Sequence, residues 1–489
     1  MITRVGFICG ACVLAGCQST TRDFQSPIEH PDAWSQLQNQ SGIPEVAIPE
    51  RWWTAFGDPD LDLLIDIALD ENFSLRMSWD RLTQARAIAR REGADLSPTL
   101  DVNGGVSRSR TQSNAGTNHT TDWDLGLLAS YEVDLWGRVR STRDAALLDA
   151  MIAEEDVHAA AISLTAEIAS RWYEYAELNE RIGVIQKQKI NNESVLEIIT
   201  AQFRAAKIRA EDVLRQRNLV ESSEGDLSVA MRQAETLRLE LLILLGLSPD
   251  AHLPVDRPAL VDLPSLPDMG LPSTLLQQRP DVRSAYRGVQ AADRRAAAAI
   301  ADQYPSISLS ASAGTTGSRA SDLFDNWVAN LAGNIVQPLF DGGRREAEVD
   351  RTLAVTSEAI NNYGQAVLTA LHEVETALAQ ERQQALYVES LDRQFDTAQK
   401  VVDRVRDSYL SGQSEYLNVL DAQTSVQQLE IQLLEARRVL INDRVNLFRA
   451  LAGDWSMEPP EQAKFAEVDD AKNSPDIGAV QEQRSGVRQ

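Results

Sequence analysis

The chain has 489 residues, of which 43% are hydrophobic, and its formal net charge is −25 at pH 7. A chain of this length and composition can bury two or three hydrophobic cores, so general disorder is excluded. A strongly negative surface repels phosphates, which argues against nucleic acid as a partner. The three cysteines, Cys9, Cys12 and Cys17, all lie in the first seventeen residues. The rest of the chain therefore holds no disulfide framework and no cysteine-based metal site.

The N-terminus, MITRVGFICGACVLAGCQST, carries one positive charge and then an apolar run from Val5 to Ala15. The run is shorter than the ~20 residues needed to span a bilayer and matches the apolar region of a signal peptide. The motif LAGC resembles the bacterial lipoprotein box, which implies a signal peptide over 1–16 and a covalent lipid on Cys17. Gln18 resembles the outer-membrane sorting pattern. An ordinary cleaved signal with an incidental cysteine is the alternative.

Proline positions divide the remaining chain into two bodies and a linker. Proline is absent between Pro98 and Pro249 and between Pro338 and Pro459, whereas seven prolines occur from Pro249 to Pro280. In each body the pattern predicts a helix, two strands, a very long helix, a turn and a returning helix. The predicted ranges are 59–94, 98–110, 122–136, 137–205 and 210–246 in the first body, and 272–302, 305–318, 327–340, 343–411 and 414–452 in the second.

The two bodies are related by a duplication at an offset of about 206 residues. Apolar residues recur every seventh position in the last helix, and the positions 206 residues earlier are apolar too: Val419, Val426, Leu433, Leu440 and Leu447 correspond to Val213, Val220, Leu227, Ala234 and Leu241. A second track three residues on contains Ala422, Leu429, Ala436 and Ala450. Such heptads predict left-handed packing of nearly parallel helices, the longest of them roughly 100 Å long. A soluble helical bundle fits the helices equally well.

The strand pattern distinguishes only in part between a membrane barrel and a soluble protein. From Leu125 to Leu135, apolar residues alternate with polar ones, and Leu128 is the single exception. A run of about ten residues suits a tilted transmembrane strand with its apolar side toward lipid. A soluble sheet with one buried face alternates in the same way. Four strands cannot close a barrel, so a membrane barrel requires further copies of the chain: two copies supply eight strands and three supply twelve.

The stretch SYEVDLWGRVRS, 130–141, runs from a strand pattern directly into a helix pattern. Gly137 is the only turn residue between the two patterns. A glycine relaxes the backbone where the geometry changes from strand to helix. The prediction is a wall of strands that continues as a wall of helices, with Gly342 and Gly343 at the equivalent place in the second body.

The chain resembles the outer-membrane efflux proteins, the TolC-like exit ducts, in their lipoprotein branch. The matching motifs occur in family order over about residues 50 to 456: YEVDLWGRVR, LLGLSPD, LPSTLLQQRPDVRSAYRGVQAA, YPSISLSASAG, QPLFDGGRREAEV, ALHEVETALAQ, YLSGQSEYLNVLDAQTS and NLFRALAGDW. The resemblance implies a mixed, mostly α fold in which a homotrimer combines a twelve-stranded outer-membrane barrel with a periplasmic helical tunnel. It also implies the role of exit duct in a tripartite efflux system, with a periplasmic adaptor and an inner-membrane pump, most often proton-driven and of the RND type.

The resemblance also implies how the chain is divided into domains. After the signal peptide, an N-terminal lipidated segment and a proline-rich linker wrap the middle of the tunnel, and a tail ends the chain. The polar composition of the tail predicts that it is disordered after its first residues. The boundaries are 17–58 for the lipidated segment, 59–246 for the first repeat, 247–271 for the linker, 272–452 for the second repeat and 453–489 for the tail.

The resemblance further implies a gate at the periplasmic turns, where the family's gate carboxylate falls on Asp421. Some relatives have an acid at Asn418 and an arginine near Ser414, so the closed state here is held by different or fewer polar links. Arg209 and Arg215 are candidates for those links. Gly412 suits the C′ position of the long helix and Ser414 the N-cap of the next. Tyr409 completes the gate, and the residues of the turn ends implied to contact the adaptor are Lys207, Arg209, Gly412 and Gln413.

No sequence feature indicates an enzyme, a cofactor or a metal site. The HEVET segment at His372 lacks the second histidine of a zinc-peptidase motif, and no phosphate-binding loop is present. Two alternatives to an efflux duct stay open: an exit duct for type I protein secretion, and a lipid-anchored periplasmic coiled-coil protein.

Overall fold

The computed structural model describes residues 51–114, 116–255, 258–263, 266, 278–451 and 457. Cys17, the start of the helix predicted at 272 and the C-terminal tail after Met457 lie outside the described residues. The chain forms two compact units. One contains Gln84–Ile152 and Ala285–Gly364, and the other contains the described residues of His30–Thr83, Ala153–Ser284 and Gln365–Gln489. Each unit therefore combines segments from both halves of the sequence.

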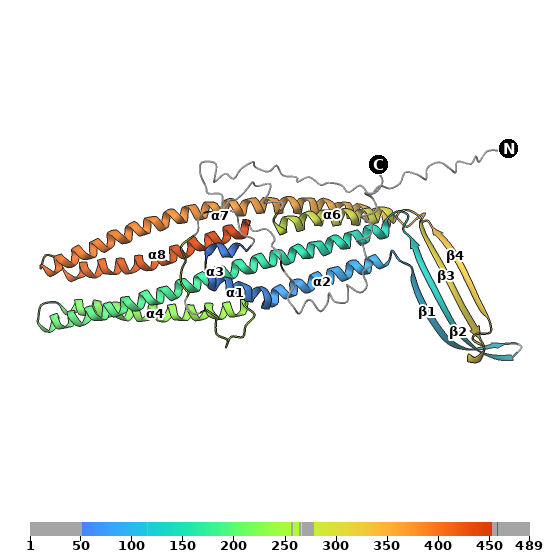
Figure 1. Cartoon of the computed structure of the whole chain (residues 1–489), viewed down its shortest axis with the longest axis horizontal. Coiled ribbons are helices and arrows are strands. Elements are labelled where there is room, and N and C mark those ends of the chain that lie inside the picture. The colour runs from blue at the N-terminus through green and yellow to red at the C-terminus, as the bar shows by residue number, and fades with distance from the viewer. Residues whose placement is uncertain are drawn as a thin grey trace, which may run out of the picture. The chain divides into compact units, whose positions relative to one another are not determined.

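Two helices of 67 residues dominate the fold: α3 (Arg138–Arg204) and α7 (Arg344–Leu410). Each is followed by a returning helix, α4 (Ala210–Leu244) or α8 (Tyr416–Leu451) (Figure 1). All four lie close to their predicted ranges. The returning helices pack on the long ones through the predicted heptad positions, for example Ala234 against α3 and Leu433 against α7. Among the described residues, no helix combines the length and the apolar character needed to cross a membrane.

The single helix predicted over 59–94 is wrong, because Asn72 separates α1 (Pro59–Glu71) from α2 (Phe73–Ala94). Asn72 has extended backbone, with ψ at 121°. Its Oδ1 accepts a hydrogen bond from the Leu75 N–H at 2.9 Å, and its Nδ2 donates to the Leu244 carbonyl at 2.8 Å. A tertiary contact to the end of α4 thus stabilises the break, and no proline or glycine in the sequence predicts it. Helix α6 (Pro280–Ala301) is the corresponding helix of the second half.

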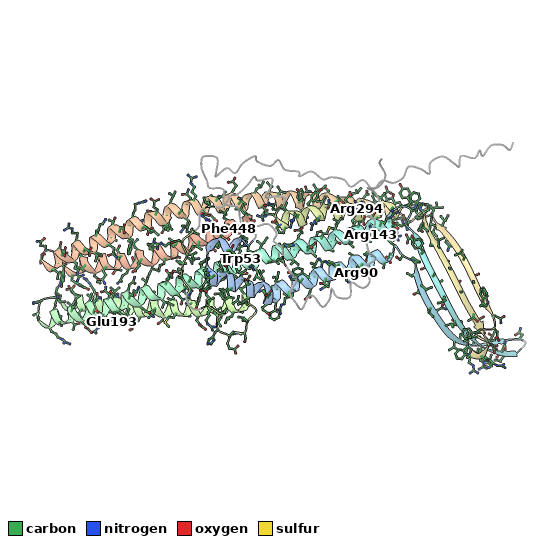
Figure 2. All side chains as sticks on the ribbon, in the orientation of Figure 1. Trp53, Arg90, Arg143, Glu193, Arg294 and Phe448 are labelled. Carbon is green, nitrogen blue, oxygen red and sulfur yellow. The ribbon has the colours of Figure 1, made fainter. Side chains whose placement is uncertain are left out.

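The largest apolar core lies where a short 3-10 helix, η1 (Trp52–Phe56), packs on the long helices. Trp52 is fully buried and stacks on Phe448 of α8, with ring centroids 5.8 Å apart. Trp53 and Phe448 belong to this same core (Figure 2). Trp172 of α3 donates from its Nε1 to Asp58 Oδ2 at 2.7 Å, while Asp58 Oδ1 caps the start of α1. The segment before α1 is therefore fixed to the long helices by both apolar and polar contacts.

Four antiparallel strands form one sheet in the order β1-β2-β3-β4 (Figure 1). Their bounds are β1 (Thr99–Ser113), β2 (Gly116–Val133), β3 (Ser306–Gly317) and β4 (Trp327–Val336). The pairing of β2 with β3 joins the two repeats. The predicted extension of the last strand to residue 340 is wrong. Gln337 and Pro338 follow β4, and a proline cannot donate to the ladder.

One face of this sheet is apolar across all four strands. The register aligns Val102 of β1 with Leu127 of β2 and with Ala313 of β3, and Ala313 with Ala329 of β4. Every residue of β4 is exposed, including Leu331 at 83%. In the single chain β1 and β4 are edge strands, each with one row of backbone groups that the sheet does not pair.

Candidate functional site

The turn between α7 and α8 closes the end of the second hairpin with a Schellman motif. Gly412 has left-handed backbone, with φ at +76°. Its N–H donates to the Tyr409 carbonyl at 3.0 Å, and the Gln413 N–H donates to the Ser408 carbonyl at 2.8 Å. This pair of bonds satisfies the last carbonyls of α7, so the prediction of Gly412 at C′ is confirmed.

The turn between α3 and α4 has the same shape without a glycine. Ala206 has φ at +58°, and it is the only non-glycine residue of the described chain with positive φ. Its N–H donates to the Phe203 carbonyl at 2.8 Å, and the Lys207 N–H donates to the Gln202 carbonyl at 3.0 Å. The duplication therefore preserves the turn even though an alanine occupies the left-handed position.

The starts of the returning helices differ from the prediction. Helix α8 begins at Tyr416, so Glu415 and not Ser414 precedes its first residue, and the N-cap role predicted for Ser414 is wrong. The Asn418 backbone N–H bonds the Glu415 carbonyl at 3.2 Å, while Asn418 Nδ2 donates to Ser414 Oγ at 3.0 Å. Arg209 holds the equivalent place before α4 and lies 3.8 Å from Glu415, so this exposed ion pair links the two turns. An exposed pair of this kind adds little stability.

A small apolar cluster lies directly behind the two turns. Ile199, Val213, Tyr416 and Leu420 are buried, and Tyr409 packs against them. The rings of Tyr409 and Tyr416 are 5.7 Å apart in an edge-on arrangement. The Tyr409 hydroxyl donates to Gln202 Oε1 at 2.9 Å. Burial raises the pKa of both tyrosines, so both rings stay neutral at physiological pH.

Next to this cluster, Asn192 of α3 is the centre of a buried polar network. Asn192 is fully buried. Its Oδ1 accepts from Gln423 Nε2 at 3.0 Å and from Gln427 Nε2 at 3.1 Å, both on α8. Its Nδ2 donates to Ser223 Oγ at 3.3 Å on α4. We call the six residues Asn192, Gln216, Ser223, Tyr416, Gln423 and Gln427 the Asn192 network.

Gln216 extends the network through α4. Its Nε2 donates to the backbone carbonyl of Asn192 at 2.8 Å, and its Oε1 accepts from the Tyr416 hydroxyl at 2.6 Å. Gln216 is also fully buried. The network thus joins the hairpin of the first repeat to the first turns of α8. Buried polar groups that satisfy one another specify a single pairing of helices, because separation leaves them unpaired.

The sequence analysis missed this network, although a signal for it was present. Gln216 and Ser223 lie three residues after Val213 and Val220, which places them on the second heptad track. Asp443 occupies the same track between Ala436 and Ala450, and it is buried as well. Polar residues at core positions of a heptad specify the register and partner of a helix.

The candidate gate residues lie on an exposed side of α8. Asp421 and Asn418 are both exposed and three residues apart, so they share one side of the helix. Leu420 points into the apolar cluster instead. Arg215, at the position of α4 that the duplication relates to Asp421, is exposed too. Within one chain the structure does not bring Asp421 into the Asn192 network.

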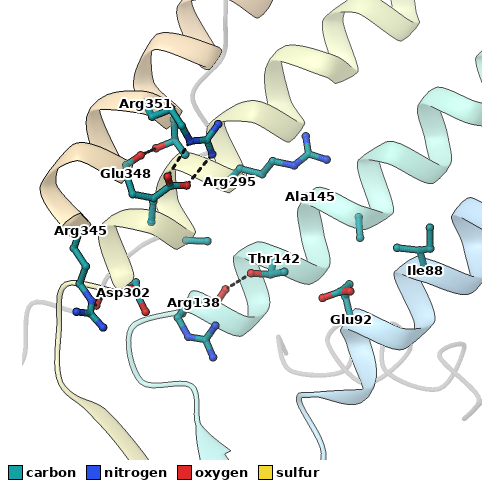
Figure 3. Close-up of a pocket in the computed structure, with 14 residues that line it drawn as sticks. Ile88, Glu92, Arg138, Thr142, Ala145, Arg295, Asp302, Arg345, Glu348 and Arg351 are labelled. Atoms are coloured by element: carbon teal, nitrogen blue, oxygen red, sulfur yellow. Dashed lines mark hydrogen bonds and ion pairs between the residues drawn. The ribbon is translucent and has the colours of Figure 1, made fainter. Parts of the chain in front are cut away.

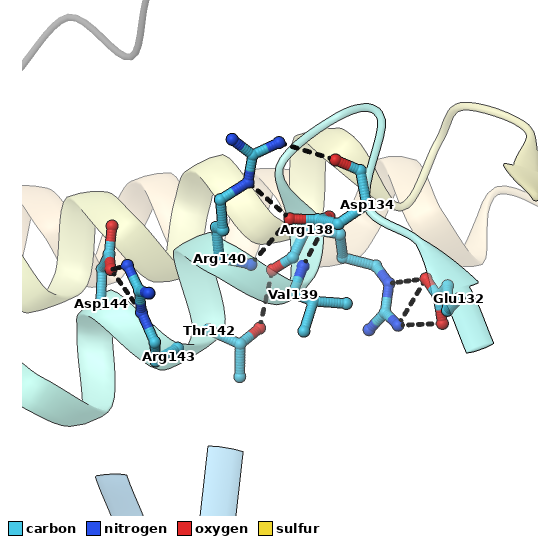
Figure 4. Close-up of polar contacts among 8 residues, drawn as sticks. All are labelled: Glu132, Asp134, Arg138, Val139, Arg140, Thr142, Arg143 and Asp144. Carbon is cyan, nitrogen blue, oxygen red and sulfur yellow. Dashed lines mark hydrogen bonds and ion pairs between the residues drawn. The ribbon is translucent and has the colours of Figure 1, made fainter. Parts of the chain in front are cut away.

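The first junction between strand and helix contains Gly137 and is capped by Asp134, whose contacts are drawn in Figure 4. Gly137, with φ at +76°, lies between β2 and α3. Asp134 accepts hydrogen bonds from the N–H groups of Val139 and Arg140, both at 3.0 Å, and caps α3. Burial alone would raise the pKa of the Asp134 carboxyl, but these bonds and the Arg140 side chain lower it. The carboxylate is therefore charged where it meets the helix N-terminus.

The junction between β4 and α7 follows the same plan. Gly342 and Gly343 both have left-handed backbone, with φ at +69° and +84°. Asp341 accepts from the Arg345 N–H at 3.3 Å, and Arg345 also pairs with Asp302 at 2.9 Å. Asp341 therefore plays the part of Asp134 at the second junction, and Gly343 that of Gly137.

A pocket of about 510 Å³ lies between α2, α3, α6 and α7 beside these junctions (Figure 3). Its arginines are already paired with carboxylates: Arg138 with Glu132, Arg295 with Asp149, Arg345 with Asp302, and Arg351 with Glu348. The pocket therefore has no unpaired arginine to bind an anion, and we assign it no ligand. Over the described ranges, no group of three or more histidine, cysteine, aspartate or glutamate side chains is arranged to hold a metal ion.

Two duplicated halves, each with one long helical hairpin and two strands of a shared sheet, define a class of channel subunits. The family model of the outer membrane efflux proteins matches residues 64–247 and 271–453, so the chain belongs to this family. The chain is therefore an outer-membrane efflux protein with the fold of the TolC-like channels. The two matched ranges correspond to the two halves of the duplication.

Individual relatives agree with this assignment. The chain is 32% identical to the pyoverdine export outer membrane protein OpmQ of Pseudomonas aeruginosa, over 92% of this chain and 96% of that protein. It is 31% identical to the outer membrane protein OprJ of the same organism, over 91% and 94%. The solved structure of the Neisseria gonorrhoeae MtrE outer membrane channel in its open state superposes with a TM-score of 0.80 at 30% identity, over 90% of this chain and 99% of that one.

Proposed function

We propose that three copies of this chain assemble into a passive exit duct whose wall is a twelve-stranded barrel in the outer membrane. The edge strands of the sheet support this proposal. In lipid the unpaired backbone groups of β1 and β4 would each cost several kcal/mol, and pairing β1 of one chain with β4 of the next removes that cost. The apolar face shared by all four strands would then contact lipid.

The second part of the proposal places the gate at the ends of the helical hairpins. In a closed ring of three chains, the exposed side of α8 that carries Asn418 and Asp421 faces the axis. Three copies of Asp421 would repel one another and attract cations, which gives a narrow, cation-selective neck. The Asn192 network holds α8 against the first repeat in this state, because moving α8 outward would break the hydrogen bonds of Gln423 and Gln427.

The partners follow from the same arrangement. A periplasmic adaptor would contact the exposed turn ends, which carry Lys207, Arg209, Gly412 and Gln413. An inner-membrane pump would supply the energy, because the duct itself only conducts small molecules. Cys17 would carry the lipid that anchors the N-terminus in the outer membrane.

Cysteine crosslinking provides a direct test, because the chain after Cys17 contains no thiol. One cysteine is placed on β1 in place of Asn103, and a second replaces Asn330, Ala332 or Asn334, which lie on the same face of the sheet on β4, in separate variants. Oxidation in outer-membrane vesicles should give a ladder that stops at three chains for at least one pair. A matched pair on β2 and β3, whose pairing is internal, should crosslink only within the chain. The proposal would be overturned if none of the β1–β4 cysteine pairs gave crosslinked dimers and trimers and the protein carried no ionic current in planar bilayers.

A further inference from the structure

The apolar face of the sheet ends in basic residues at the hairpin end, away from the helices. Along β1 this face continues past Val106 to Arg108 and Arg110. Along β2 it continues past Trp123 to Thr121 and His119. The register pairs Arg108 with Thr121 and Arg110 with His119, so these side chains occupy two successive rows about 7 Å apart.

Contacts at the glycines of the sheet establish which side chains share this face. A Cβ built on Gly104 lies 3.6 Å from Leu125, which belongs to the apolar face. A Cβ built on the next residue, Gly105, lies 2.6 Å from a carboxylate oxygen of Asp124. Asp124, and with it Asp122 two residues earlier, therefore lies on the opposite face. The basic rows on the apolar face of β1 and β2 contain no carboxylate, and all of Arg108, Arg110 and His119 are exposed.

An apolar groove lies on the same face, with the row of Val106 and Trp123 between it and the basic rows. It has a volume of about 530 Å³ and is lined by Val102, Leu125, Leu127, Phe324 and Trp327, among others. Phe324 and Trp327 are 80% and 77% exposed, far more than aromatic side chains that pack inside a protein. Gly126 and Gly314 also line the groove.

We propose that this end of the sheet binds a phosphorylated membrane lipid, with its acyl chains in the groove and its headgroup phosphate on Arg108 and Arg110. The inference rests on the proposed insertion of the sheet in the outer membrane. The two guanidinium groups provide charge-assisted hydrogen bonds to phosphate oxygens, and His119 adds a further donor. Aromatic side chains at the border of an apolar band suit the boundary between acyl chains and headgroups.

The arrangement fits a lipid better than a free anion. A soluble phosphate would use the basic rows alone and would leave the exposed groove empty. A lipid fills the groove and the basic rows together. Both arginines lie on β1 near its hairpin end, away from the helices, so with the helices in the periplasm the headgroup would lie in the outer leaflet.

The test measures retention of lipid by the assembled protein in detergent with native mass spectrometry. The probe is diphosphoryl lipid A, compared with phosphatidylcholine and with inorganic pyrophosphate. The double variant Arg108→Gln/Arg110→Gln should retain at least about tenfold less diphosphoryl lipid A, because it removes two charge-assisted contacts. Trp327→Ala should weaken lipid retention and leave the weak binding of pyrophosphate unchanged.

The control Arg393→Gln/Arg437→Gln removes the same charge from exposed helix positions outside the sheet and should retain lipid as the parent does. Each variant is first checked for trimers on unboiled gels and for channel current. If the parent forms neither, the proposed function fails, independently of the lipid site. If the parent forms both and the double variant keeps its lipid, or if pyrophosphate displaces the lipid at equal concentration, the lipid site is overturned.

Discussion

Ala206 and Gly412 hold the same left-handed position in the two turn ends, 206 residues apart in the sequence. Both turns make the same pair of hydrogen bonds to the last carbonyls of their long helix. The first turn therefore has this backbone shape although an alanine, and not a glycine, occupies the left-handed position. A residue with a Cβ in this conformation costs about 1–2 kcal/mol, so the first-repeat turn is strained and the second is not.

Replacing Ala206 with glycine should stabilise the first turn. The gain should be about 0.5–1 kcal/mol, since the relief of the left-handed strain is partly offset by the higher entropy of glycine in the unfolded chain. Hydrogen exchange of the amides around residues 203–210 measures the effect locally. The reverse change Gly412→Ala should accelerate exchange around 409–416. A variant Ala206→Gly that exchanges faster than the parent would contradict the assigned turn.

Truncation of Asn192 should loosen α8 from the first repeat. Asn192→Ala leaves the half-buried amides of Gln423 and Gln427 without their acceptor, which should cost about 1–3 kcal/mol of stability. The measurement is thermal unfolding of the purified protein together with single-channel conductance, which should rise as the hairpins separate. Ser194→Ala, two residues away on an exposed side of α3, should change neither. Equal melting temperatures for Asn192→Ala and Ser194→Ala would show that the network contributes nothing.

Neutralising the proposed gate should change which ions pass. Asp421→Ala combined with Asn418→Ala should raise conductance and permeability to large antibiotics. It should also lower the preference for cations roughly fivefold, because removing a carboxylate a few ångströms from a passing ion in a wet channel is worth on the order of 1 kcal/mol. The readouts are current and reversal potential in planar bilayers. Ser425→Ala, on the same exposed side of α8, is the matched control. Unchanged conductance and selectivity in the Asp421 variant would exclude this residue from the gate.

Asp443 should make stability depend on pH. Burial, together with the charge of Glu381, raises the pKa of Asp443 to about 6 in the folded chain. The folded protein therefore holds this proton while the unfolded chain, with an ordinary pKa near 3.9, has lost it. Stability falls as pH rises from about 4 through about 6, by at most about 3 kcal/mol, and the loss persists at higher pH.

Asp443→Asn separates this effect from other titrations. The variant should melt at a higher temperature than the parent at pH 7.5 and at nearly the same temperature at pH 4. Thermal unfolding at several pH values provides the measurement. A difference between the two proteins that does not vary with pH would show that Asp443 ionises normally in the folded chain.

Local sequence patterns were sufficient for the long and returning helices, for the presence of four strands and for the duplication. The heptads of α8 and the alternation in β2 each reflect a single repeating geometry, in which neighbouring residues along the chain decide which side is apolar. The C′ glycine at Gly412 was predictable for the same reason, because only the turn itself demands left-handed backbone. The assignment to the outer membrane efflux proteins rested on motifs and was confirmed by the family comparison.

The tertiary structure decided features that depend on distant partners. The break at Asn72 requires the Leu244 carbonyl, and the Asn192 network requires residues of α8 more than 200 positions away. Ser414 lost its predicted N-cap role because α8 begins two residues later, where Tyr416 reaches Gln216. The pairing of Arg108 with Thr121 and of Arg110 with His119 was fixed only by the register of β1 on β2. A one-residue shift in that pairing would move every side chain of β1 to the other face of the sheet. The sequence of one strand does not determine its register on the next.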